Sequence, residues 1–565
     1  MNVSRVASLL VLLLAAAPAA EAQGAARARP RAVDLARGAQ RAFESFRRSR
    51  SPVGPGGSGA CEVRIGRFCY WDNNGEGEPP PEPAAVGTRR RELLERLVAA
   101  SSAAPEDDWV AGQRVRYLVE DGQLAEAAAA ARACAGTRWW CRALLGFALH
   151  EASDHAGAAA AYDSALALMP ERERCGWLDV SPWMADGADD YKRLGCGAPR
   201  DSATRYYTWL ARPLWLLPGD DALAELLSRR VMSRVLAGSP QAYSSPWGGD
   251  LEELTLRYAW PVAWSRVQRI TEESVVGHEP TPSYDVTPTQ RALQRPAAAE
   301  EEDWEPRRRR ARMRYAPRYV RREKAFGPVE HQLVLFKRGD SLLVAVAYDL
   351  GADSAWTRGD ARVALVVAAS PGRELARAEA DGASRVGVLM ARMPREAGVA
   401  SVEAWSPRAS FAARSRYGVR PLAVDAQVSS LAVLRAPPPT SAPLTEDVLL
   451  TLLGTRTVRA GDAVHLYWES YAPSAGDSSQ VSLSMQRVHV GLLERAASRI
   501  RLAPRARPVT MRWTEPGGGE RLGRALALRI PEVPAGTYRV ELAVGAGDGP
   551  ATAATTVRVL PRERR

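Results

Sequence analysis

The spacing of apolar residues changes once along the chain, from a helical period to a period of two. From residue 89 to about 172 the apolar positions recur as they do on the faces of helices. From His331 onward they alternate along strand-length runs, the clearest of which is Leu342, Val344, Val346 and Tyr348. Because a helical pattern does not form a sheet, the sequence predicts a multidomain α + β protein, with helices first and antiparallel sheets last.

Residues 89–172 contain an internal repeat of 34 residues. At this interval Gly112 aligns with Gly146, and Ala131 aligns with Ala165. Small residues at this period, where two helices approach each other, are the signature of tetratricopeptide (TPR) repeats. We therefore predict TPR-like helical repeats over 89–172, with flanking helices that cap the stack.

The segment 173–270 is predicted to be a helical domain rich in tryptophan. The break at Pro218-Gly219 separates two helices, and Asp220 or Asp221 is placed to cap the second one. In the later stretch PWGGDLEEL, Asp250 is placed to cap a helix, with Glu253 as its capping-box partner. The tryptophans of this segment are Trp177, Trp183, Trp209, Trp215, Trp247, Trp260 and Trp264.

Proline-rich stretches mark the boundaries in the C-terminal half. Residues 271–330 combine prolines with an acidic run and a basic run, which predicts a solvated linker. One antiparallel β-sandwich is predicted over 331–437, where three prolines end it. A second, immunoglobulin-like (Ig-like) sandwich is predicted over 443–562, because the turn Pro534–Tyr538 leads into a late alternating strand.

The first residues have the pattern of a secretory signal. Arg5 precedes a short apolar run and then small residues, which predicts a signal peptide over 1–22. Residues 23–88 have no sustained periodicity and are predicted to be mostly disordered. No later run reaches the roughly 18 apolar residues of a membrane helix. We expect an exported protein, periplasmic or extracellular, that does not span a membrane.

All six cysteines lie in the N-terminal third, an even number that predicts disulfides in an oxidising compartment. Zinc ligation is disfavoured, because the spacings are not C-x2-C and no histidine flanks them. Proximity in sequence favours three pairs, although other pairings stay open: Cys61 with Cys69 as a small loop, Cys134 with Cys141, and Cys175 with Cys196.

The net charge of +11 comes almost entirely from arginine, since the lysines are only Lys192, Lys324 and Lys337. Arginines interspersed with acidic residues suit solubility and surface ion pairs better than a phosphate-binding track. Together with export, this distribution leads us to expect no nucleic-acid partner.

The sequence contains no common catalytic, metal-binding or cofactor-binding motif. It has no G-x-S-x-G elbow, Walker A loop or dinucleotide-binding glycine fingerprint. The closest histidines, His150 and His155, are five residues apart, a spacing that puts the two side chains on different faces of a helix. We therefore predict no catalytic residue, no metal ligand and no cofactor.

One enzymatic alternative stays open, in which carboxylates among tryptophans hold a sugar. The carboxylates would be Asp186, Asp189 or Asp190 on one side and Asp250, Glu252 or Glu253 on the other. The simpler interpretation is that the tryptophans form a core and the acidic residues cap helices. The ligand surface to be tested consists of Trp209, Trp215, Trp247, Asp250 and Trp260.

Several segments together resemble the secreted, TPR-bearing GWxTD-like proteins, a bacterial group found notably in Gemmatimonadota. In place of the naming motif this chain has Pro246-Trp247-Gly248-Gly249-Asp250, with Pro for the first Gly and Gly for Thr. The resemblance implies export and a β-rich C-terminal half, and it implies no particular activity. The matching segments are CEVRIGRFCYW, WLARPLWLLPG, PWGGDLEELTLRYAWPVAWSR, GHEPTPSYD, RYAPRY and GDAVHLYWESY.

These patterns favour an exported, non-catalytic binding or scaffolding protein. The TPR-like face and the β-domains would hold a protein or peptide partner in the cell envelope. The alternative is a carbohydrate-binding or carbohydrate-active protein that uses the tryptophan-rich region 173–270, with polysaccharide as its partner.

Overall fold

The computed structural model describes residues 30–562 with gaps at 53–62, 71–80, 185–187, 241–245, 262–263, 269–272, 277–288, 305–326, 352–353, 355, 357–358, 438–445, 472–477, 489–508, 517–519 and 546–548. The chain divides into two compact units. The helices through α11 belong to the first unit, and the sandwich strands belong to the second. The mixed α + β architecture expected from the sequence is confirmed.

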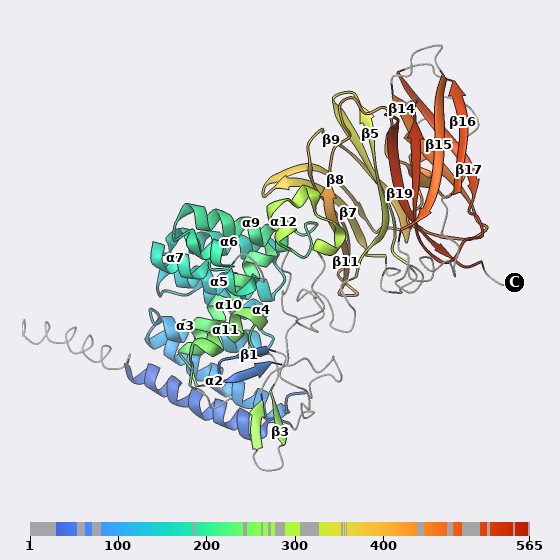
Figure 1. Ribbon diagram of the computed structural model, residues 1–565. Helices are drawn as coiled ribbons and strands as arrows, with labels where there is room; N and C mark the ends of the chain where they lie inside the picture. Colours follow the sequence, from blue (N-terminus) through green and yellow to red (C-terminus); the bar gives the residue numbers. More distant parts are fainter. Residues whose placement is uncertain are drawn as a thin grey trace, which may run out of the picture. The chain divides into compact units, whose positions relative to one another are not determined.

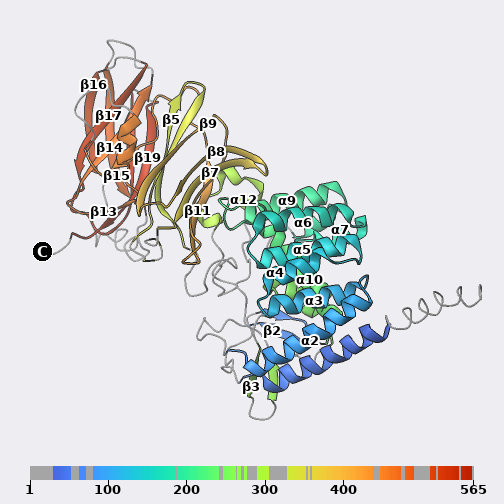
Figure 2. The same cartoon turned by 180° about the vertical axis from the view of Figure 1, so that it is seen from behind.

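The first unit is built around antiparallel helix pairs (Figures 1 and 2). Residues 30–50 are helical, so the expectation that 23–88 is mostly disordered is wrong for this stretch. The pairs α3/α4 and α5/α6 coincide with the predicted repeat. The helices are α2 (Ala84–Ala103), α3 (Asp108–Glu120), α4 (Leu124–Arg132), α5 (Arg138–Glu151) and α6 (His155–Leu168).

Aspartate side chains cap two of these helices, and small residues let helices approach each other. Asp107 accepts a hydrogen bond from the backbone N–H of Val110 at the start of α3, and Asp154 acts in the same way for α6. At Gly146 a Cβ atom would lie 2.9 Å from the ring of Tyr162. Glycine is therefore required where α5 crosses α6.

The tryptophan-rich region continues the first unit with shorter helices. As predicted, Asp220 caps α10 by accepting a hydrogen bond from the N–H of Leu223. Two short hairpins also belong to this unit. The elements are α7 (Glu171–Trp177), η1 (Ser181–Trp183), α8 (Ala188–Arg193), α9 (Ala198–Ala211), α10 (Asp221–Ala237), α11 (Gly249–Tyr258), β1 (Val63–Ile65), β2 (Phe68–Tyr70), β3 (Ser265–Gln268) and β4 (Glu273–Val276).

In the second unit, the strands that come first in the chain form two facing sheets. The sheets have the orders β5-β6-β9 and β11-β10-β7-β8, and all pairings are antiparallel. An apolar core lies between them. The strands are β5 (Glu330–Arg338), β6 (Ser341–Asp349), β7 (Arg362–Ser370), β8 (Arg373–Asp381), β9 (Val386–Pro394), β10 (Gly398–Ser406) and β11 (Phe411–Val419).

The later strands repeat this arrangement. They form sheets of order β12-β14-β17 and β13-β19-β18-β15-β16, around a second apolar core; β13 pairs with β19 in parallel, and the other pairings are antiparallel. The strands are β12 (Ala432–Leu434), β13 (Thr457–Arg459), β14 (Ala463–Tyr471), β15 (Ser478–Arg487), β16 (Val509–Pro516), β17 (Arg521–Arg529), β18 (Gly536–Val544) and β19 (Ala551–Leu560).

A third apolar layer joins the two sandwiches. It contains Phe336 and Leu343, from the outer side of the β5-β6-β9 sheet, and Tyr467 from β14. The four sheets described in the second unit are therefore stacked, with apolar contacts between successive layers. Strand β12 lies inside the range 331–437 predicted for the first sandwich, but it pairs with β14 of the second. The first sandwich ends with β11.

The segment predicted as a linker, 271–330, contains ordered elements. Besides β4 it includes α12 (Gln290–Gln294), η2 (Pro296–Ala298) and η3 (Glu301–Asp303). The residues from Gln294 to Trp304 belong to the second unit. There the backbone N–H of Gly418 in β11 donates to the carbonyl of Ala299, and Trp304 is buried. This part of the range is folded onto the first sandwich, because its apolar side chains cover the β11 end of a sheet.

Candidate functional site

The residues of the tested ligand surface do not form a common solvent-facing surface. Trp209, Trp215 and Trp260 are buried, with exposed fractions of 7%, 3% and 4%. Trp247 is half-buried against the small apolar cluster around Leu251. A buried ring offers no free face to a sugar, so these side chains act in packing. The core interpretation accounts for them, and the surface interpretation does not.

Trp215 belongs to the second unit, within the three-residue segment Leu214–Leu216. The guanidinium of Arg416 lies 4.0 Å from the centre of its ring. Arg416 is also paired with the carboxylate of Glu403 at 3.1 Å, and both side chains are fully buried. The second oxygen of Glu403 accepts a hydrogen bond from the backbone N–H of Leu216. The segment thus supplies a backbone hydrogen bond and an aromatic ring to a buried ion pair on the β11-β10-β7-β8 sheet.

Asp250 binds the β1–β2 hairpin. Its carboxylate accepts hydrogen bonds from Nε and Nη2 of Arg67 at 2.6 and 2.7 Å and from the Arg67 backbone N–H. The hydrogen bonds from Arg67 hold the pKa of Asp250 well below its usual range. At Gly66, which has a φ of 52°, a Cβ atom would lie 2.5 Å from the Cβ atom of Asp250. The two segments CEVRIGRFCYW and PWGGD therefore meet in the fold, and their contact is structural.

The predicted capping box at α11 is wrong. The N-cap residue is Gly248, which makes no side-chain capping hydrogen bond. Glu253 pairs instead with Arg257, one turn further along the helix, at 2.8 Å. Asp250 is drawn to Arg67 because a bidentate contact with a guanidinium is stronger than a single capping bond.

The other candidate carboxylates are also committed to arginines or lie apart. Asp190 on α8 pairs with Arg193, and Glu252 on α11 lies 3.5 Å from a nitrogen of Arg230. Asp189 is exposed on α8. Asp186 lies outside the described residues. The structure thus gives no paired carboxylates beside an open tryptophan face in the part of this region that it describes.

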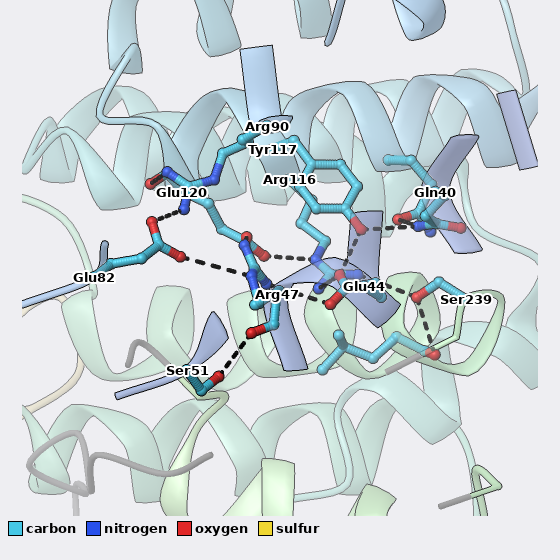
Figure 3. A network of polar contacts seen from close by, with 12 residues as sticks. Gln40, Glu44, Arg47, Ser51, Glu82, Arg90, Arg116, Tyr117, Glu120 and Ser239 are labelled. Atoms are coloured by element: carbon cyan, nitrogen blue, oxygen red, sulfur yellow. Dashed lines mark hydrogen bonds and ion pairs between the residues drawn. The ribbon is translucent and has the colours of Figure 1, made fainter. Parts of the chain in front are cut away.

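The densest polar cluster of the first unit was not found from the sequence. It joins helix 30–50 to α2 and α3 and is drawn in Figure 3. Arg47 lies at its centre, 2.5 Å from a carboxylate oxygen of Glu120 and 3.5 Å from one of Glu44. Arg116 contacts the same two carboxylates at 2.7 and 3.0 Å. We call this group of side chains the Arg47 network; it consists of Gln40, Glu44, Arg47, Glu82, Arg90, Gln113, Arg116, Tyr117, Glu120 and Asp121.

Hydrogen bonds from uncharged side chains extend the Arg47 network towards α10. The hydroxyl of Tyr117 donates to Glu44 at 2.6 Å, and Nε2 of Gln40 lies 3.2 Å from that hydroxyl (Figure 3). Nε2 of Gln40 also donates to the side-chain oxygen of Gln113. The side-chain nitrogen of Gln113 in turn donates to the backbone carbonyl of Val235 on α10. The chain of bonds therefore connects helix 30–50, α3 and α10.

Burial and charge shift the pKa values in this network in opposite directions. Burial alone would raise the pKa of Glu120, but the charges of Arg47, Arg116 and Arg90 outweigh it and lower the pKa from 4.5 to about 2. Burial raises the pKa of Tyr117 far above 10, so its hydroxyl stays protonated as a donor. Near neutral pH Glu120 is therefore a charged carboxylate beside the charged Arg47 and Arg116, and Tyr117 is a neutral phenol.

The arrangement of the Arg47 network favours a role in stabilising the fold over a role in catalysis. Its carboxylates and guanidinium groups form bonds with one another, and Glu44, Arg47 and Arg116 are buried from solvent. The polar positions 40, 44, 47 and 51 recur every three or four residues, on the same face as Val33, Ala36 and Phe43. A helical period was thus present in the sequence. Because four of these seven buried positions are polar, an apolar pattern could not reveal it.

Helix α10 covers a face of the repeat helices. Nε2 of His150 on α5 lies 2.8 Å from Glu225 of α10, whose other oxygen accepts from Arg229 at 2.7 Å. The hydroxyls of Tyr162 on α6 and Ser228 on α10 are 2.7 Å apart. A Cβ atom added at Gly112 in α3 would meet Trp140 and Val235. The face that we considered for a partner is therefore occupied, over these helices, by the chain's own α10.

Two of the three expected disulfides are present. Cys134 is joined to Cys141, across the turn between α4 and α5, and Cys175 is joined to Cys196. Cys61 lies outside the described residues, as does the side chain of Cys69, so their pairing stays a prediction. Disulfides persist in oxidising compartments, which is consistent with an exported protein.

A second buried ionic group links the two sandwiches. Arg338 of β5 is paired with Glu469 of β14 at 2.8 Å, and both side chains are about 95% buried. Glu469 also accepts hydrogen bonds from the hydroxyls of Tyr467 and Tyr471, and the Tyr471 hydroxyl accepts one from the backbone of Lys337. The contact fixes the rotation of one sandwich against the other, because each bond has a set direction.

No family model and no curated protein matches this sequence.

Metal-binding clusters and membrane-spanning helices can both be assessed in the described part of the chain. There, no group of three or more His, Cys, Asp and Glu side chains is arranged to hold a metal ion. None of the described helices is long and apolar enough to cross a membrane. The signal peptide predicted over 1–22 lies outside the described residues.

Proposed function

We propose that this chain is an exported, non-catalytic binding or scaffolding protein of the cell envelope. TPR-like repeats form its helical part, and two Ig-like sandwiches form a rigid β part that carries surfaces for a protein or peptide partner. The observation that carries this proposal is the continuous stacking of four sheets through three apolar layers. Such a body keeps its surfaces at fixed positions, as a scaffold requires.

Strand order supports the Ig-like assignment. In the first sandwich, the smaller sheet contains the first, second and fifth strands, and the larger sheet places the fourth, third, sixth and seventh side by side. The second sandwich has the same order when the short strand β13, which lies beside β19 at the edge of the larger sheet, is left out of the count. In the second sandwich, Tyr538 at the start of β18 donates its hydroxyl to the carbonyl of Pro534 at 2.7 Å. A tyrosine that bonds to the backbone a few residues upstream, at this corner, is typical of Ig-like domains.

The TPR-like assignment rests on the helix pairs and on the glycines at their crossings. The partner surface of the proposal, however, is not the face covered by α10. The uncovered candidates are the sandwich surfaces and the outer side of the helix pairs. Exposed apolar side chains occur on both, such as Val386 on β9, Val509 on β16 and Leu168 at the end of α6.

Two observations favour a non-catalytic role over the carbohydrate-active alternative. Of the tryptophans that would stack on a sugar, Trp209, Trp215 and Trp260 are buried and Trp247 is half-buried. The carboxylates of Asp190, Asp250, Glu252 and Glu253 are paired with arginines. A general acid or nucleophile needs a carboxylate within reach of substrate. Export is supported by the two disulfides, which are rare in reducing compartments.

Site-specific photocrosslinking of the full-length chain, expressed with residues 1–22 in its bacterial host, tests the proposal. A photoreactive residue replaces Val386, Arg512 or Leu168 in turn, each of which is exposed. We expect a discrete adduct with one envelope protein from at least one of these surfaces. A chain without residues 1–22 is the control and should give no such adduct.

The same preparation is assayed for release of sugars from a polysaccharide panel. Sugar release that is lost in Asp250→Asn and Asp190→Asn variants, together with the absence of any discrete adduct, would replace the scaffold proposal with the carbohydrate-active one. A chain retained in the cytoplasm with an intact N-terminus would contradict export.

A further inference from the structure

A small notch opens where α2, α3 and α4 meet. Its volume is about 140 Å³. A water molecule takes up about 30 Å³ in the liquid, so the notch has room for several waters or for a short aliphatic chain. It is lined by Ser101, Ser102, Ala104, Pro105, Asp107, Val110, Ala111, Arg114, Ala130, Ala133 and Cys134.

The notch exists because its walls are small. Alanines 104, 111, 130 and 133 stand where larger side chains would fill the space between the helices. The disulfide from Cys134 to Cys141 holds one edge of the notch at the end of α4. The alanine methyl groups can contact a methylene chain, although polar atoms form the larger part of the lining, and the disulfide holds one edge of the opening in place.

Arg114 is the only cation among the residues that line the notch. It is half-buried; its Nε is shielded from solvent and has no hydrogen-bond partner. No carboxylate among the described residues forms an ion pair with it, in contrast to Arg116, which pairs with two. A guanidinium without its usual partners binds a carboxylate through two parallel N–H donors.

The acidic side chain in the notch does not neutralise Arg114. Asp107 and Arg114 lie on the same face of α3, seven residues apart, which is about 10 Å along a helix. No ion pair joins these two described side chains. Asp107 is in addition used to cap α3, by accepting from the N–H of Val110. The half-buried Ser101 hydroxyl is a further donor in the notch.

We propose that this notch binds one carboxylate on a short aliphatic chain, such as an acidic side chain of a peptide partner, with Arg114 as its counterion. The proposal rests on the proposed binding function, because it assigns a chemical class to one of that function's contacts. The methylene groups would contact the alanine walls, while the carboxylate replaces the partners that Arg114 lacks within the fold.

Ligand-observed saturation-transfer NMR on the full chain tests this, with butyrate as the probe and butyramide as its uncharged analogue. We expect saturable butyrate binding with a Kd on the order of 1 mM, as befits so few contact atoms. Arg114→Gln should weaken it about tenfold, through loss of the charged donor. Ala133→Leu should weaken it too, by filling the notch while Arg114 keeps its charge.

Arg96→Gln is the matched control, since Arg96 is exposed on α2 and the substitution removes the same charge. Equal butyrate binding by the wild-type chain and Arg114→Gln would overturn the proposal, and so would equal binding of butyramide. If inorganic phosphate displaces butyrate and binds more tightly, the notch is a phosphate site and the carboxylate assignment is wrong. Each outcome is independent of photocrosslinking at Val386, Arg512 and Leu168, so failure of one proposal can be told from failure of the other.

Discussion

The interior of the helical unit and the interior of the β unit are stabilised by different kinds of interaction. Helix 30–50 is joined to α3 largely through charged and amide side chains of the Arg47 network. The four sheets of the β unit are joined by apolar layers, and ionic groups such as Arg338 with Glu469 occur at single points between them. Apolar layers stabilise in proportion to buried area, whereas a buried ionic group favours one arrangement of its partners over others.

The largest expected effect tests the apolar side of this comparison. Trp468 on β14 is fully buried between the sheets of the second sandwich. We expect Trp468→Ala to lower the free energy of unfolding by about 3–5 kcal/mol, because the cavity cannot collapse between two sheets. Urea denaturation, followed by circular dichroism in the β-sheet region, measures it. Val509→Ala, at an exposed position on β16, is the control and should change stability little.

The ionic side is tested by Glu44→Gln. This change leaves the buried guanidinium of Arg116 with one carboxylate instead of two. It also weakens the contact between residue 44 and Arg47. Loss of one partner from a buried ion pair should cost about 3 kcal/mol. Hydrogen exchange of residues 30–50 provides the readout, and Glu95→Gln on the exposed side of α2 is the control. Unchanged exchange would show that apolar contacts alone hold this helix.

Acid should loosen the helical unit before the β unit. The folded-state pKa of Glu120 is lowered from 4.5 to about 2, so its charge contributes stability above pH 4.5 that is lost as the pH falls towards 2. We expect roughly 2–3 kcal/mol to be lost over this window. Helical circular dichroism against pH would show it. The variant Glu120→Gln lacks the titrating group, and its pH slope should be flatter in the same window.

The Cys134–Cys141 disulfide should contribute about 2–3 kcal/mol, the value expected for a short closed loop. The double variant Cys134→Ser/Cys141→Ser, compared with the wild-type chain in thermal unfolding of the helices, measures this contribution. The reduced wild-type chain also lacks this disulfide, so its helices should likewise unfold at a lower temperature than those of the oxidised wild-type chain. If the variant unfolds at the wild-type temperature, the disulfide does not stabilise the turn between α4 and α5.

The smallest effect is expected at the exposed hairpin contact. Asp250→Asn removes the charge that binds Arg67, whose side chain is 45% exposed. A solvated ion pair of this kind contributes little to stability, so global stability should hardly change. Local hydrogen exchange at β1 and β2 should still rise. A large global loss would mean that the hairpin is part of the folding core.

Period and spacing were sufficient for the elements whose buried faces are apolar. The 34-residue repeat predicted the helix pairs, and alternation predicted strands such as β6 and β18. Strand β11 has no clear alternation of apolar residues, because Arg414 and Arg416 occupy positions that the fold buries. A sequence read for apolar faces assigns such arginines to solvent, and only their partners in the fold make their burial possible.

The candidate site shows the same limit. The segments that carry Arg67 and Asp250 were both noticed, but their contact spans 183 residues and has no local signature. The tryptophans of 173–270 were correctly seen as unusual, while their burial depended on which helices cover them. The occupation of the repeat face by α10 was equally beyond local patterns, since the spacing of α10 is that of any amphipathic helix.

The sequence by itself determined the helical and β halves. Proximity in sequence favoured the disulfide pairs Cys134–Cys141 and Cys175–Cys196, and the cap of α10 was narrowed to Asp220 or Asp221. Each of these depends on neighbours within a few turns or on a short loop. The tertiary structure alone decided the Arg47 network, the contact of Arg67 with Asp250, the strand partner of β12 and the apolar layer between the sandwiches. These are contacts between distant residues, whose free energy appears only when the chain brings them together and excludes water.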